Sequence, residues 1–317
     1  MVRMHEALRN LPRLIVTSVV RGSEQGQSHG GVYTVDFESQ NVVQHIDWNR
    51  GDIDFTGRGW DRGLRGIDFF QKRVYIAASD ELFVYDPAFV KRGSHRNPYL
   101  KHCHEIWRQD KLLFLTSTGY DSLLAFDVER EAFVWGLLVT HEDGQWRGQA
   151  FDPNAESGPP FVNNFHINMV YVDQTGLYFS GMRTGAVLHV DGNLDISEFC
   201  SLPPGAHNAR PFRDGVLFND TEADCVRYVD RNGNGAAFPI ITYDESEIIY
   251  RGVDDSKLAR QAFGRGLCPL DDRFIAAGSS PSTVSIYDLQ SGQRALSVNL
   301  TMDIRNAIHG LEIWPYD

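Results

Sequence analysis

Two residue types, histidine and arginine, recur at comparable places along the chain and could do chemistry together. The six residues are Arg65, His104, His166, His207, Arg265 and His309. Each is the second residue of a short segment that reads as a strand, such as CHEIWR (103–108) or AHNARP (206–211). In four of the copies the next apolar run begins nine residues later. This spacing predicts that each repeat contributes one such side chain to a common centre.

Imidazole nitrogens are good ligands for divalent first-row transition metals. The predicted ligands are His104, His166, His207 and His309. Fe(II) is the favoured ion, with Mn(II), Zn(II) and Cu(II) as alternatives. Arg65 and Arg265 are predicted to flank an open position and to bind an anionic group of the substrate, because guanidinium groups recognise carboxylates well. A structural or anion-binding ring without metal fits the same residues, as does a chance alignment.

A metal held in this way predicts a mononuclear metal-dependent enzyme that acts on a small anionic or polar organic molecule. Oxygenase, lyase or isomerase, and hydrolase chemistry all stay open. Glu105, Asn208 and Glu312 adjoin the predicted ligands in sequence and could hold them in place. The alternative is a non-catalytic protein that binds a protein partner or a small ligand, with the ring serving only the structure.

The elements that must position these side chains repeat six times. Each copy contains an apolar run that ends in Asp, as in VYTVD (32–36), LFVYD (82–86) and VSIYD (284–288). The alternation predicts a half-buried strand, and the closing Asp predicts a turn in which the carboxylate accepts backbone N–H groups. Another apolar run precedes each copy, for example LIVTS (14–18). Together these runs predict repeated antiparallel hairpins.

Six repeats of four antiparallel strands predict an all-β, six-bladed β-propeller that forms one domain over residues 1–317. The first repeat has no innermost strand before residue 14. A matching segment, AIHGLEIW (307–314), lies at the other end of the chain. We therefore expect the C-terminal strand to complete the first blade, which closes the ring and removes an open sheet edge.

The net charge and the cysteines of the chain limit the classes of partner and the compartment that we expect. The formal net charge is −12, which disfavours binding to nucleic acid or to anionic membrane surfaces. We predict no membrane span and no secretory leader. The four cysteines are far apart in the chain and fit reduced thiols, which predicts a cytoplasmic protein. No pattern in the sequence indicates an oligomeric state.

Three long segments, 48–63, 141–164 and 241–263, lead into predicted innermost strands and carry aromatic residues. We expect them to gather over the ring as a lid that selects the substrate, or simply to pack on one another. Residues 254–262 are predicted to form a short helix.

The repeats, the Asp-terminated strands and the terminal closure resemble the six-bladed class that includes the SMP-30/gluconolactonase and NHL-type propellers. That resemblance covers nearly the whole chain and implies the architecture. It does not extend to lactonase activity, because the metal ligands of SMP-30-type enzymes are carboxylates and amides. Four histidines on one centre are similar in ligand type to the Fe(II) site of carotenoid cleavage oxygenases. The motifs HEIW, FHIN, AHNARP, GRGL and HGLEIWP also resemble a group of uncharacterised bacterial propellers with a His/Arg ring.

Overall fold

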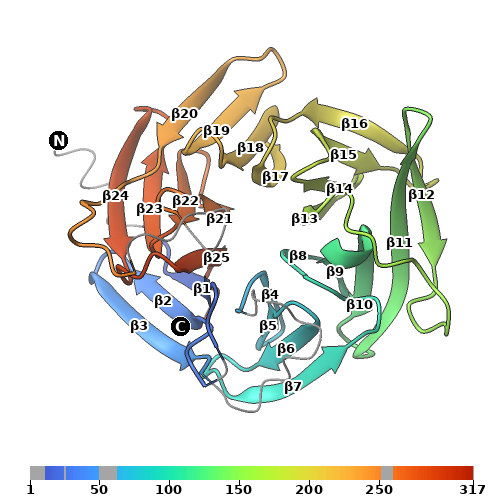
Figure 1. Ribbon diagram of the computed structural model, residues 1–317, viewed down its shortest axis with the longest axis horizontal. Coiled ribbons are helices and arrows are strands. Elements are labelled where there is room, and N and C mark those ends of the chain that lie inside the picture. The colour runs from blue at the N-terminus through green and yellow to red at the C-terminus, as the bar shows by residue number, and fades with distance from the viewer. Residues whose placement is uncertain (1–10, 25, 50–62, 251–259, 317) are drawn as a thin grey trace. The chain divides into compact units, whose positions relative to one another are not determined.

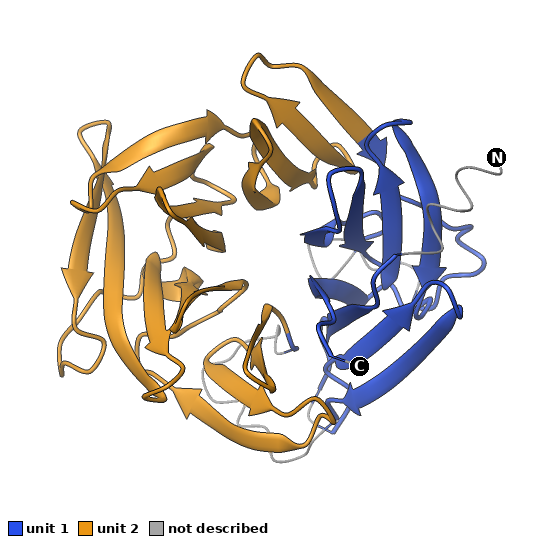
Figure 2. Cartoon of the chain, turned by 180° about the vertical axis from the view of Figure 1, so that it is seen from behind, with its two compact units in different colours: residues 1–64, 238–317 blue, residues 65–237 orange. Residues whose placement is uncertain are grey.

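The chain is an all-β six-bladed propeller built from antiparallel sheets, as the repeats predict (Figure 1). The structure, a computed structural model, describes residues 11–24, 26–49, 63–250 and 260–316. It divides into two compact units, residues 1–64 with 238–317 and residues 65–237 (Figure 2). Each unit has its own hydrophobic core.

The unit of residues 65–237 contains four blades that follow one another along the chain. The first is β4 (Ile67–Phe70), β5 (Arg73–Ala77), β6 (Glu81–Tyr85) and β7 (Lys91–Arg96). The second is β8 (Ile106–Gln109), β9 (Leu112–Ser117), β10 (Ser122–Asp127), β11 (Ala132–Glu142) and β12 (Gln145–Phe151), with the 3-10 helix η1 (Thr118–Tyr120) after β9. The third is β13 (Ile167–Asp173), β14 (Gly176–Gly181), β15 (Ala186–Val190) and β16 (Ile196–Ser201). The fourth is β17 (Ala206–Phe212), β18 (Gly215–Asp220), β19 (Cys225–Asp230) and β20 (Gly235–Pro239).

The other unit contains two blades and the closure of the chain. One blade is β21 (Arg265–Pro269), β22 (Phe274–Ser279), β23 (Thr283–Asp288) and β24 (Gln293–Asn299). The other is β25 (Asn306–Ile313), β1 (Leu14–Val20), β2 (Gly31–Asp36) and β3 (Asn41–Asp47), in that order across the sheet. Strand β25 pairs with β1 from Leu14↔Ile313 to Val20↔Asn306. The prediction that the C-terminal strand completes the first blade is therefore confirmed.

The Asp residues that end the repeated strands form the turns predicted from the sequence. In each of the six copies a carboxylate oxygen accepts one or two backbone N–H groups from the following residues. The residues are Asp36, Asp86, Asp127, Asp191, Asp230 and Asp288. At Asp288 the Arg273 guanidinium adds two hydrogen bonds, and together these donors lower the pKa of the carboxyl to about 2.

The second blade departs from the expected four strands. Residues 145–151, predicted to belong to a lid, form β12, which pairs with β11 as a fifth strand at the outer edge. The lid prediction is wrong for this part of the segment, because the backbone hydrogen bonds of 145–151 are made within the sheet. Trp60 and most of the helix predicted over 254–262 lie outside the described residues.

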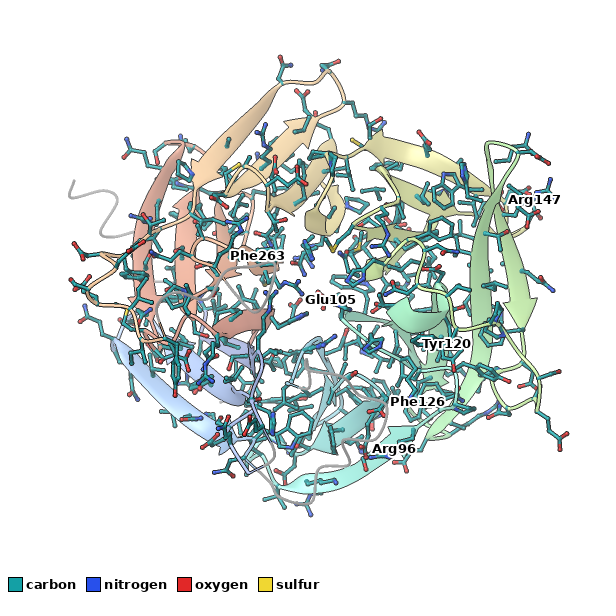
Figure 3. All side chains as sticks on the ribbon, viewed as in Figure 1. Arg96, Glu105, Tyr120, Phe126, Arg147 and Phe263 are labelled. Carbon is teal, nitrogen blue, oxygen red and sulfur yellow. The ribbon has the colours of Figure 1, made fainter. Side chains whose placement is uncertain are left out.

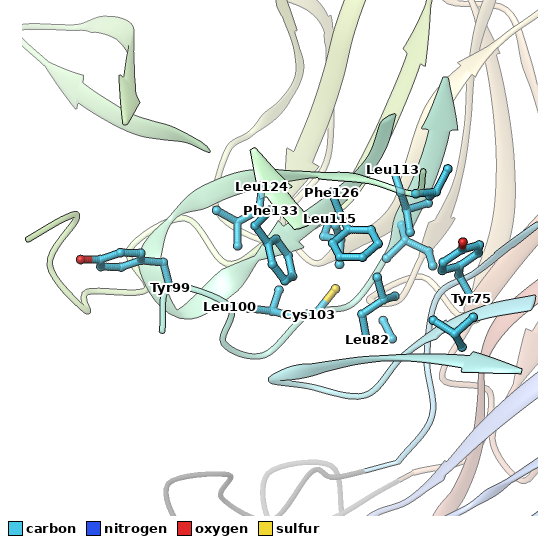
Figure 4. Packing of buried hydrophobic residues seen from close by; sticks show 14 residues of the cluster. Tyr75, Leu82, Tyr99, Leu100, Cys103, Leu113, Leu115, Leu124, Phe126 and Phe133 are labelled. Carbon is cyan, nitrogen blue, oxygen red and sulfur yellow. The ribbon is translucent and has the colours of Figure 1, made fainter. Parts of the chain in front are cut away.

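Apolar side chains fill the junctions between neighbouring blades. Between the first two blades of the four-blade unit, Tyr75, Leu82, Leu115, Phe126 and Phe133 belong to one buried cluster (Figure 4). Further clusters lie between the second and third blades and between the third and fourth. No helix among the described residues is long and apolar enough to cross a bilayer.

Candidate functional site

In five of the six blades the inner strand is irregular at or beside the predicted His or Arg residue. In the first blade, Arg65 N–H donates to Ala77 O (2.8 Å) and Ala77 N–H donates to Gly66 O (2.9 Å), so two residues oppose one. In the second, the backbone N–H groups of His104 and Glu105 donate to the hydroxyl of Thr116, at 2.9 and 3.1 Å. Bulges re-aim side chains and are common beside functional sites.

The remaining inner strands repeat the irregularity. In β17, His207 pairs with Asn219 and Arg210 with Leu217. In β21 the shift falls between Arg265 and Leu267, and in β25 it leaves His309 as the extra residue. Five of the six residues predicted from the sequence therefore lie at or directly beside an irregularity of their inner strands.

The third blade differs, and the register predicted for His166 is wrong. Here Ile167 pairs with Gly181 and Met169 with Ser180, so Asn168 is the extra residue. His166 lies two residues earlier, with a left-handed backbone (φ 53°). The spacing to β14 explains the difference, because Leu177 follows Asn168, rather than His166, by nine residues. The ring of His166 instead contacts that of His104, with 5.1 Å between the ring centroids.

The bulges bring a second polar side chain to the site from two blades. Glu105 follows His104 and Asn208 follows His207. In a regular strand the side chain of each would point to the opposite face of the sheet from the histidine before it. Instead, Asn208 Nδ2 donates to Glu105 Oε2 at 3.0 Å, although their strands β17 and β8 belong to blades separated by a third. Asn219 Nδ2 in turn donates to Asn208 Oδ1 at 3.0 Å. Glu105 therefore lies at the inner end of its blade (Figure 3).

Two of the histidines are oriented by the same local contact. His104 Nδ1 lies 2.6 Å from His102 O, and His207 Nδ1 lies 2.8 Å from Gly205 O. A carbonyl oxygen only accepts hydrogen bonds, so Nδ1 carries the proton in both rings and Nε2 carries the lone pair of the neutral form. Hydrogen bonds of this kind typically orient metal-ligating histidines. The donor chemistry of these two rings therefore fits a transition metal.

Arg65 is enclosed beside His104. Its side chain is 0% exposed, and Nη1 donates to Cys103 O at 3.1 Å and lies 3.5 Å from His104 Nδ1. The guanidinium therefore adds positive charge to the site without a surface on which a ligand could lie. Its predicted contact with an anionic substrate stays a prediction.

In the other unit the corresponding residues bind each other. Arg265 Nη1 lies 3.0 Å from His309 Nε2. Arginine only donates hydrogen bonds, so this imidazole nitrogen accepts one. The Arg265 guanidinium also lies over the ring of Phe263, 4.8 Å from its centre. Glu312 contacts the thiol of Cys268, with 3.6 Å between Sγ and Oε2.

Within the described parts of the chain, no three side chains of the His, Cys, Asp and Glu types stand together as a metal site. The sequence did not identify Asn168 and Asn219 as site residues. The nine-residue offset could have found Asn168, whereas nothing in the sequence pairs Asn219 with Asn208.

Comparison with known proteins supports the architecture. No family model matches the sequence, and no curated protein matches it. A chain of a nidogen/laminin complex is similar over 95% of this chain and 97% of its own length, with 9% identity and a TM-score of 0.58. A protein of unknown function from Bacteroides caccae is similar over 96% and 98%, with 10% identity and a TM-score of 0.57. At these identities the likeness shows the fold alone.

Proposed function

We propose that the chain is a mononuclear metal-dependent enzyme that acts on a small anionic or polar organic molecule at the inner strands of the four-blade unit. In the metal-bound protein His104, His166 and His207 would converge to hold the ion, with Fe(II) favoured over Mn(II), Zn(II) and Cu(II). The predicted fourth ligand, His309, belongs to the other unit, where Arg265 donates to it. A bound ion would polarise a substrate oxygen, activate water or bind O₂.

The observation that carries this proposal is the matched orientation of His104 and His207. Each ring donates through Nδ1 to the carbonyl oxygen two residues earlier, and each is at least 95% buried, with exposed fractions of 5% and 2%. Burying polar groups is costly, and the blades already have apolar cores, so stability alone does not call for these residues. The carboxylate of Glu105, held by Asn208, adds an anionic group that would help to bind a cation or to orient a substrate.

A non-catalytic propeller is the second candidate, in which the His and Arg side chains serve the structure and a protein partner or small ligand binds elsewhere. The Arg265–His309 hydrogen bond favours it, because these two predicted site residues bind each other.

Metal content separates the two candidates. We expect protein purified without an affinity tag to contain close to one equivalent of a transition metal by mass spectrometry. Replacing His207 by Ala should abolish stoichiometric uptake while circular dichroism stays unchanged. His189→Ala is the matched control, because His189 lies on β15 and contacts Thr175 O. Less than about one-tenth of an equivalent, with no uptake by the apoprotein, would favour the non-catalytic candidate.

A further inference from the structure

A second site lies at the junction between the third and fourth blades of the four-blade unit, away from the histidines. A groove of about 720 Å³ opens there between β16 and the ends of β18 and β19. This volume falls in the range of small-molecule sites. Its lining residues include Phe199, Cys200, Val216, Val229 and Arg231. The groove is independent of the proposed metal site.

The floor of the groove is apolar because it leads into the core between the two blades. Val216 is fully buried and belongs to the same cluster as Tyr178 and Phe218. Phe199, Cys200 and Val229 are partly buried and pack against that cluster. The Phe199 ring also makes an edge contact with Tyr178, with 5.1 Å between ring centroids, which fixes the wall of the groove. An apolar ligand that enters the groove would cover the parts of Phe199, Cys200 and Val229 that water now reaches.

The charged residues that line the groove differ in whether their side chains can meet a ligand there. The Arg231 guanidinium lies over the Phe199 ring, 5.9 Å from its centre, and forms no ion pair with any described residue. Asp230 is occupied by its own turn, where it accepts the backbone N–H groups of Asn232 and Asn234, each at 2.8 Å. Glu198 pairs with Leu188, whose side chain belongs to the core between the second and third blades, so Glu198 lies on the opposite face of the sheet from the groove. The charge placed to meet a ligand in the groove is therefore that of Arg231.

We propose that this groove binds a small amphipathic carboxylic acid, whose apolar or aromatic body lies on Phe199, Cys200 and Val229 and whose carboxylate pairs with Arg231. A guanidinium recognises a carboxylate through two parallel N–H groups, and an aromatic wall beneath it favours a planar apolar body. Cys200 provides a reporter, because it lines the groove, whereas Cys103, Cys225 and Cys268 are buried.

Three probes with one aromatic body test the proposal: 2-naphthoate, 2-naphthamide and 2-naphthylmethylamine, which are anionic, neutral and cationic. Affinity is measured by calorimetry, and occupancy by the rate at which N-ethylmaleimide alkylates Cys200, followed by peptide mass spectrometry. We expect 2-naphthoate to bind most tightly and to slow alkylation of Cys200. Arg231→Gln should weaken 2-naphthoate about fivefold and leave 2-naphthamide unchanged. Arg213→Gln is the matched control, because Arg213 lies over Phe212 and Tyr228 and does not line the groove.

The proposal is overturned if the neutral or cationic probe binds as tightly as 2-naphthoate, or if no probe protects Cys200. It is also overturned if Arg231→Gln binds 2-naphthoate as tightly as the wild type. Arg231 is exposed, so this variant is expected to fold, and its unfolding temperature checks that it does.

Discussion

Two blade junctions of the four-blade unit are built from the same repeat, yet one is sealed and the other is open. Between the first and second blades, Phe126 is fully buried and meets Phe133 and His95, with ring centroids 5.1 and 4.7 Å away. The fifth strand, β12, adds Phe151 to this cluster. Between the third and fourth blades the outer positions hold smaller or partly exposed residues, Phe199, Cys200 and Val229, and the groove remains.

The difference teaches that the repeat fixes the inner part of a junction and leaves its outer part to individual residues. Near the inner strands both junctions have fully buried aliphatic side chains, such as Leu115 in one and Val216 in the other. Towards the outside, large aromatics close one junction, whereas glycines at 215 and 233 line the other. A propeller can therefore gain a binding groove at a blade junction without any change of fold.

The largest expected effect comes from opening the sealed junction. Phe126→Ala removes a fully buried ring and should lower the free energy of unfolding by about 3–5 kcal/mol. The matched change at the open junction, Phe199→Ala, should cost about 1 kcal/mol, because this ring is only partly buried. Urea titrations of both variants measure the difference. Equal losses would mean that the two junctions are packed alike.

The polar link across the sealed junction should make its stability depend on pH. Asp68 on β4 accepts the backbone N–H of Arg108 on β8 at 2.7 Å, and burial raises the pKa of its carboxyl to about 6. Its ordinary value is 3.8, so between about pH 4 and 6 the folded chain holds a proton that the unfolded chain releases. Asp68 therefore favours folding at low pH, and this contribution is lost as pH rises through 6.

Replacing Asp68 by Asn isolates that contribution, because the amide oxygen can still accept the Arg108 N–H. The wild type should lose up to about 3 kcal/mol relative to Asp68→Asn between pH 4 and 7. Unfolding free energies of both proteins at pH 4, 5.5 and 7 give the comparison. A constant difference between them across this range would show that Asp68 has an ordinary pKa.

The smallest expected effect is that one added methyl group stabilises the protein at the open junction and destabilises it at the sealed one. Val229→Ile extends a side chain into the groove and should raise the free energy of unfolding by about 0.5 kcal/mol. Val84→Ile adds the same group to the sealed junction, where Val84 is 4% exposed, and should lower it by about 1 kcal/mol. Thermal unfolding of both variants and of the wild type measures the two changes. If both changes destabilise the protein, the groove does not offer the room described.

The sequence by itself determined the repeat, the six blades and the closure of the first blade by the last strand. These follow from three local patterns. Apolar residues alternate, an Asp at the end of a strand binds its own turn, and the first repeat lacks an inner strand that the C-terminal segment can supply. The nine-residue offset also placed Arg65, His104, His207 and Arg265 where their inner strands become irregular, because a constant distance from a hairpin fixes the place of a residue on its strand.

Only the tertiary structure decided which side chains meet. The ladder of β13 has its extra residue at Asn168, two residues after His166, and the bulge after His104 turns Glu105 towards Asn208. Residue type and spacing do not encode these outcomes, because a bulge depends on how two strands pair and a junction depends on segments far apart in the chain. For the same reason the groove beside Phe199 becomes visible only once the third and fourth blades are placed together.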